Sequence, residues 1–69
     1  MINGYIMQHG VIGSRTSLRV LNCKNDMDAI RTASELIQEW EKNGVDKVHV
    51  MIVKDGHRVC YMKIDEKVA

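Results

Sequence analysis

The chain has no long apolar run, no large excess of either charge, and few cysteine or aromatic residues. Its 69 residues include ten Lys and Arg against nine Asp and Glu, which leaves a formal net charge of +1. A dedicated nucleic-acid-binding domain is usually strongly basic, so this balance argues against that class. It argues equally against an acidic disordered tail. A composition that is 45% hydrophobic instead favours a folded chain.

Membrane and secretory patterns are also absent. No stretch approaches the ~20 apolar residues of a transmembrane helix. The first residues lack the charged and apolar regions of a signal peptide. We therefore expect a cytoplasmic protein without membrane contact, in which Cys23 and Cys60 are free thiols. A disulfide between them remains an alternative, which would require the end of the second strand to lie beside the middle of the fourth.

The length allows one domain, and residues 1–69 are expected to form a single small α+β unit. The predicted element order is ββαββ, with a four-stranded, mainly antiparallel sheet and one helix packed on one of its faces. The pattern predicts strands at 3–9 and 17–22, a helix at 25–43, a hairpin at 46–64, a flexible tip at about 10–16 and a frayed tail at about 65–69. The strand order stays open: the helix could connect parallel neighbours, or the two hairpins could join edge to edge.

The helix prediction depends on capping residues and on one apolar stripe. Asn25 or Asp26 can cap the N-terminus, and Asn43-Gly44 supplies a stop. Apolar side chains recur at spacings of three and four, as expected for a helix that covers a sheet. They are Ala29, Ile30, Ala33, Leu36, Ile37 and Trp40.

Asp55-Gly56 lies between two apolar runs and predicts a two-residue hairpin turn. With Lys54 opposite His57, an uninterrupted register separates two faces. The predicted core face contains Val48, Val50, Ile52, Val59 and Tyr61, with Lys63 at its edge. The second face contains Met51, Val53, Cys60, Met62 and Ile64, together with Lys47, His49 and Arg58.

This second face is more apolar than a face that only meets water. Antiparallel sheets of this size usually expose one polar side, so the pattern favours a surface covered by a partner or by a second copy. The predicted partner-binding residues are His49, Met51, Arg58, Cys60, Met62 and Ile64. The competing interpretation is that these apolar side chains are singly exposed, which is ordinary for folded proteins.

The alternative function is nucleic-acid binding through basic residues of the first half. Arg15, Arg19, Lys24 and Arg31 could contact phosphates if the fold brings them together. Aromatic stacking platforms for single strands are missing, because the chain has only three aromatic residues. The glycine loop at 10–15 leads into a strand and matches no phosphate-binding fingerprint.

Catalytic and metal chemistry find little support. Cys60 and His49 would be diagonal neighbours in the predicted register, yet a nucleophile pair also needs an orienting group and a pocket. The three histidines and two cysteines lack the close pair spacing of a zinc site. We therefore expect no cofactor or metal. The sequence predicts a non-enzymatic protein-interaction module, such as a small regulator or inhibitor, that binds a protein partner through the second face or the edge of the 46–64 hairpin. Homodimerisation is compatible with this function.

Overall fold

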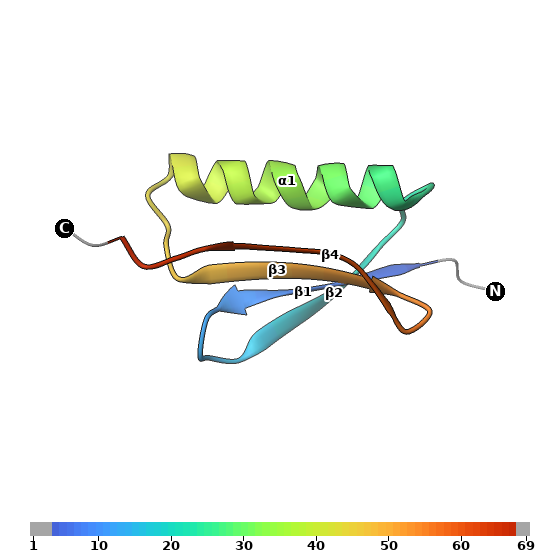
Figure 1. Cartoon of the computed structure of the whole chain (residues 1–69), viewed down its shortest axis with the longest axis horizontal. Coiled ribbons are helices and arrows are strands. Elements are labelled where there is room, and N and C mark those ends of the chain that lie inside the picture. Colours follow the sequence, from blue (N-terminus) through green and yellow to red (C-terminus); the bar gives the residue numbers. More distant parts are fainter. Residues whose placement is uncertain (1–3, 68–69) are drawn as a thin grey trace.

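The computed structural model describes residues 4–67. The elements run in the order β1 (Tyr5–Val11), β2 (Thr16–Leu21), α1 (Asp26–Lys42), β3 (Val48–Lys54) and β4 (His57–Ile64). The predicted α+β class and the ββαββ order are confirmed (Figure 1). Residue 3 of the predicted first strand and residues 68–69 of the predicted tail lie outside the described range.

All neighbouring strands are antiparallel, and their order in the sheet is β2-β1-β3-β4. The first strand is therefore central, and β2 and β4 are the two edges. β2 and β3 run parallel but are not neighbours, because β1 lies between them. α1 packs on β3 and β4, and β2 lies farthest from it (Figure 1).

The central position of β1 follows from two large side chains that face the helix. Tyr5 and Met7 are each 1% exposed and join Val50 and Ile52 in the core. The Tyr5 phenol donates a hydrogen bond of 2.7 Å to Asp26 Oδ1 at the helix start. Burial of the hydroxyl without a partner would be costly, so this bond allows a tyrosine at the end of the core.

Local signals set both ends of α1. The Asn25 side chain accepts a 2.9 Å hydrogen bond from the Asp28 N–H, as an N-cap does. At the other end Gly44 has φ +75°, a left-handed conformation that glycine adopts without strain. Two small residues, Ala29 and Ala33, are fully buried, which lets the helix backbone approach the sheet closely.

The β3–β4 hairpin begins as the sequence predicts and then departs from it. Asp55 and Gly56 have φ values of +50° and +79°, and Lys54 pairs with His57. After Val53 pairs with Arg58, the register shifts, and Ile52 pairs with Cys60. Val59 is thus an extra residue, which is the definition of a β-bulge.

The predicted register beyond Arg58 is therefore wrong, because the bulge exchanges the two faces of the rest of β4. Cys60 and Met62 pack against the core, and Ile64 is buried at 8% exposure. Tyr61, predicted to be in the core, is 47% exposed on the opposite side with Lys63. The physical reason is charge: an uninterrupted register would turn Lys63 toward the helix, where desolvation of an ammonium group is costly.

The connections at the two ends of the sheet are tighter than predicted. β1 extends to Val11 and β2 begins at Thr16, so the tip is shorter than residues 10–16. A Cβ atom at Gly10 would lie 2.8 Å from the Arg15 carbonyl oxygen, so this close approach requires glycine. In the predicted tail, the Lys67 N–H donates a 2.9 Å hydrogen bond to Asp46 Oδ2.

Candidate interaction surface

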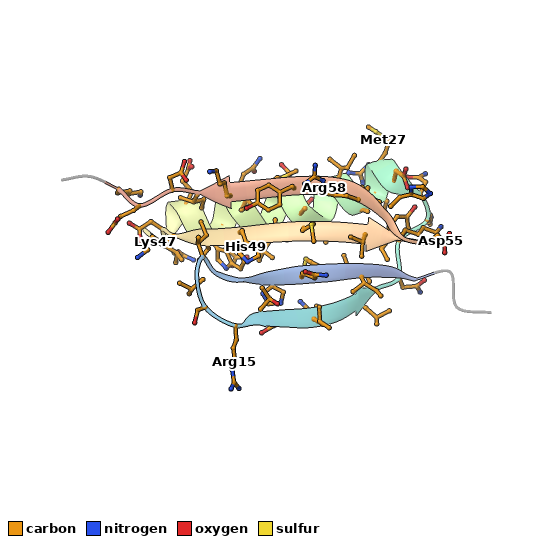
Figure 2. The ribbon with its side chains drawn as sticks, turned by 60° about the horizontal axis from the view of Figure 1, so that its bottom comes forward. Arg15, Met27, Lys47, His49, Asp55 and Arg58 are labelled. Atoms are coloured by element: carbon orange, nitrogen blue, oxygen red, sulfur yellow. The ribbon has the colours of Figure 1, made fainter. Side chains whose placement is uncertain are left out.

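One face of the sheet carries no covering element among residues 4–67. Cross-strand partners point to the same side of a sheet, so the register assigns the side chains of this open face. They are Leu18, Val20 and Thr16 on β2, Ile6, Gln8 and Gly10 on β1, Val53, Met51 and His49 on β3, and Arg58, Tyr61 and Lys63 on β4. Figure 2 shows this face with α1 behind the sheet.

Six apolar side chains of the open face form what we call the apolar patch: Ile6, Leu18, Val20, Met51, Val53 and Tyr61. Leu18 and Val20 are 68% and 67% exposed, and Tyr61 and Ile6 are 47% and 41% exposed. Val20, Ile6 and Val53 occupy one cross-strand row over β2, β1 and β3, and the paired residues Met51 and Tyr61 of the next row extend the patch to β4. Contiguous apolar surface of this kind is unusual in a protein that acts as a lone monomer.

The polar side chains beside the patch are cationic or neutral. Arg58 lies 6.0 Å from the Tyr61 ring centroid, and the rings of Tyr61 and His49 are 6.1 Å apart. Lys63 forms a 3.2 Å ion pair with Asp65. Within residues 4–67, His49 Nδ1 is the buried side-chain nitrogen that has no hydrogen-bond partner. The open-face strand positions thus contribute Arg58 and Lys63 as charges and no carboxylate.

Only part of the predicted partner-binding set shares this surface. His49, Met51 and Arg58 lie on the open face, whereas Cys60, Met62 and Ile64 lie on the helix side because of the bulge. The prediction omitted the contributions of β1 and β2, namely Ile6, Leu18 and Val20. Their alternation was visible in the sequence, but only the strand order places them beside β3.

The imagined Cys60–His49 pair is not formed, since the two side chains lie on opposite sides of the sheet. Burial raises the pKa of the Cys60 thiol, while a backbone hydrogen bond from Ile52 opposes this effect. A raised pKa disfavours the nucleophilic thiolate. Both cysteines are free thiols, as predicted, and Cys23 lies 4.0 Å from the Thr32 hydroxyl.

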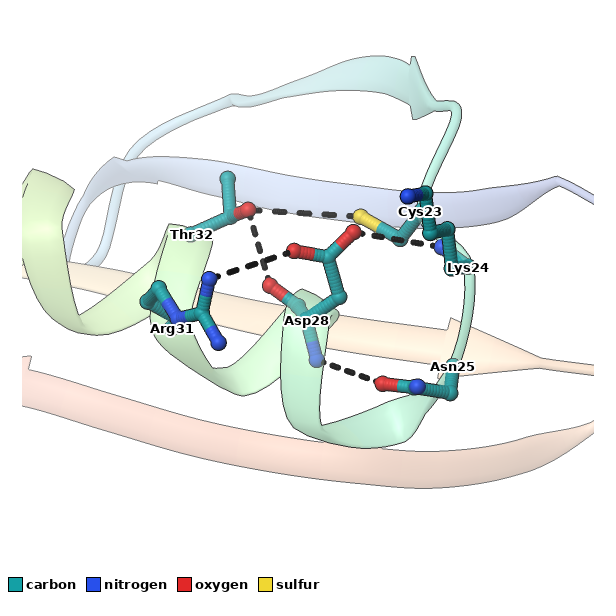
Figure 3. A network of polar contacts seen from close by, with 6 residues as sticks. All are labelled: Cys23, Lys24, Asn25, Asp28, Arg31 and Thr32. Atoms are coloured by element: carbon teal, nitrogen blue, oxygen red, sulfur yellow. Dashed lines mark hydrogen bonds and ion pairs between the residues drawn. The ribbon is translucent and has the colours of Figure 1, made fainter.

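The basic residues of the nucleic-acid alternative do not converge. Arg15 projects from the hairpin tip (Figure 2), whereas Lys24 follows the opposite end of β2. The six-residue strand between them is about 20 Å long. Arg31 pairs with Asp28 at 3.9 Å on the helix. The Asp28 carboxylate also accepts the Lys24 backbone N–H (Figure 3). These four cations therefore form no compact phosphate-binding surface.

Among residues 4–67, no three His, Cys, Asp or Glu side chains are grouped closely enough to hold a metal ion. The helix found in that range is neither long nor apolar enough to cross a bilayer.

Comparisons with protein-family models, curated proteins and solved structures found no significant match.

Proposed function

We propose that this protein is a non-enzymatic protein-interaction module that binds another protein through the open face of its sheet. The observation that carries the proposal is the apolar patch, whose six side chains span all four strands while one helix covers only the other face. A binding site of this kind needs a desolvated apolar centre and a polar rim. Met51 lies near the centre, and Arg58 contributes to the rim.

The area of the open face is sufficient for a specific complex. Four strands about 4.8 Å apart, with about six residues each at 3.3 Å per residue, give a face of roughly 19 by 20 Å. Full coverage by a flat partner would bury on the order of 1,000 Å² in total, which is near the lower limit for specific interfaces. The size thus supports a small regulator or inhibitor rather than a large assembly subunit.

Charge indicates the chemistry of the partner. The open-face strands carry Arg58 and Lys63 and no carboxylate, and Lys63 already has Asp65 as its ion partner. The matching partner presents a flat apolar surface with an acidic side chain placed to meet Arg58. We expect this complex to form in the cytoplasm, because free thiols such as Cys23 and Cys60 are typical of reducing compartments.

A matched pair of methionine substitutions tests the proposal. Met51→Lys places a charge at the centre of the patch, whereas Met27→Lys places the same charge on α1, where the side chain is 70% exposed. Each tagged variant captures proteins from a nuclease-treated lysate of the organism that makes it, and captured proteins are quantified by mass spectrometry. We expect a stoichiometric partner with wild type and Met27→Lys, and at least a tenfold loss with Met51→Lys, as for a central interface residue.

Two results would overturn the proposal. One is equal capture by all three proteins, which would place binding elsewhere on the molecule. The other is that the wild-type protein captures no stoichiometric partner. Both variants should unfold cooperatively, so that a loss of capture reflects the surface and not the fold. In a titration of the captured partner with purified protein, we expect Met27→Lys to bind as tightly as wild type and Met51→Lys to bind more weakly.

A further inference from the structure

We propose that the outer edge of β2 is a second association surface, at which β2 pairs antiparallel with β2 of a second copy of the chain. This inference does not rest on the function proposed for the open face. β2 pairs only with β1 among residues 4–67, so its other edge offers unpaired backbone N–H and C=O groups. Five of its six residues are exposed, and α1 packs instead on β3 and β4.

The two edges of the sheet differ in how they are protected. Natural proteins protect edge strands with bulges, charges, proline or a covering helix. β4 has the Val59 bulge, two cations at Arg58 and Lys63, and α1 packed against it. β2 has a regular register with β1, no proline and one charge, Arg19. The unprotected edge is therefore β2.

The sequence of β2 fits a two-fold axis through Leu18. In that register Leu18 lies opposite Leu18 of the second copy, Thr16 opposite its Val20, and Arg19 opposite its Ser17. An axis through Arg19 also pairs five strand residues but opposes the two Arg19 charges, which is unfavourable. An axis through Ser17 opposes Arg19 with Arg15 of the second copy.

A register shifted by one residue is not available to two copies of this edge, because it would turn the second copy over and present the edge of β2 that already pairs with β1. The Leu18 register keeps both open faces on one side. It yields an eight-stranded sheet in which the two patches meet at Leu18 and Val20.

The helices leave room for this pairing. α1 lies over β3 and β4, which are the strands farthest from the proposed axis (Figure 1). Thr16 to Val20 are exposed on both sides of β2, and Leu21 at the end of the strand packs partly against the core. A second copy can therefore approach along the strand without displacing the helix. Two-fold pairs of this kind are the commonest closed assemblies of identical chains.

Cysteine cross-linking tests the register directly. The background is Cys23→Ser with Cys60→Ala, checked for cooperative unfolding, and Leu18→Cys is added to it. We expect a disulfide-linked dimer on mild oxidation, because directly opposite Cβ atoms lie about 4.5–5.5 Å apart. Thr16→Cys is the matched control on the same strand and face: the two copies of residue 16 would lie about 13 Å apart. The Thr16→Cys variant should instead form a disulfide with the Val20→Cys variant when the two are mixed in equal amounts.

Equal linking of Leu18→Cys and Thr16→Cys would indicate random collision and overturn the proposal, as would preferential linking of Arg19→Cys. Sedimentation equilibrium of the wild-type chain gives a second test that needs no cysteine variants. A dimer that persists in Met51→Lys supports pairing at the edge, whereas a wild-type monomer up to sub-millimolar concentrations refutes it. Loss of the dimer in Met51→Lys would assign self-association to the open face and contradict the edge. Absence of the dimer together with successful partner capture would refute only the edge pairing. A dimer without partner capture would refute only the proposed function.

Discussion

The most direct test of the fold compares Ile64→Ala with Tyr61→Thr, because the bulge at Val59 decides which of these two residues is buried. Ile64 is 8% exposed and faces the helix side of the sheet, whereas Tyr61 is 47% exposed on the open face. Without the bulge, their positions would be exchanged. Threonine keeps a β-branched side chain at residue 61, so that strand propensity changes little.

The magnitudes follow from burial. Ile64→Ala removes three carbon atoms, a loss of about 2.4 kcal/mol at about 0.8 kcal/mol per methylene, to which an unfilled cavity adds. We expect a destabilisation of about 2–3 kcal/mol, because the end of β4 can relax. Tyr61→Thr should cost less than about 1 kcal/mol, the range of cross-strand contacts on an exposed face.

Urea denaturation followed by far-ultraviolet circular dichroism measures both values. A 69-residue domain has a total stability of roughly 3–10 kcal/mol, so Ile64→Ala approaches the limit of folding. Ile64→Val provides a milder second variant, with an expected cost of about 1 kcal/mol. A Tyr61→Thr variant that is less stable than Ile64→Ala would refute the shifted register and the open face derived from it.

Three further predictions concern single groups. Asn25→Ala should lower the free energy of unfolding by about 1 kcal/mol in the same assay, since it removes the N-cap, while Asn25→Asp should retain most of it. The hydrogen bond to Asp26, together with burial, raises the pKa of Tyr5 from 10.0 to about 12. Because the folded state favours the neutral phenol, Tyr5 contributes fully to the free energy of unfolding below pH 10, and this contribution is lost as the pH rises toward 12. Absorbance at 295 nm in a Tyr61→Phe background should show that titration, and Asp26→Asn should lower its midpoint. Iodoacetamide should alkylate Cys60 more slowly in the folded protein than in urea, because burial raises its pKa; equal rates by peptide mass analysis would contradict this.

The sequence predicts local structure well because local signals carry it. The Asp55-Gly56 turn, the Asn25 cap and the Gly44 stop each act within a few residues, and the structure contains all three. The helix bounds differ from the prediction by a single residue at each end. Period-two alternation likewise assigns Val48, Val50 and Ile52 to the core.

The candidate site is predicted only in part, because it depends on two non-local facts. The first is the bulge: a single extra residue, Val59, inverts every following side chain of β4. A signal for it exists in the sequence, since Cys60, Met62 and Ile64 form a wholly apolar set, whereas Val59 and Tyr61 share their phase with Lys63. The second is the strand order, which sequence patterns do not determine and which brings β1 and β2 into the same face as β3.

The dimensions of the elements explain why this fold leaves surface for a partner. A 17-residue helix is about 26 Å long and about 10 Å wide, so it matches the length of β4 but spans only about two strands at 4.8 Å each. Four strands therefore exceed the cover that one helix provides, and five of the six β2 residues are exposed. A solitary monomer would keep Leu18 and Val20 in water at about two-thirds exposure each. Pairing at the β2 edge and binding at the open face would each remove part of that apolar surface from water, so association supplies the cover that the helix lacks.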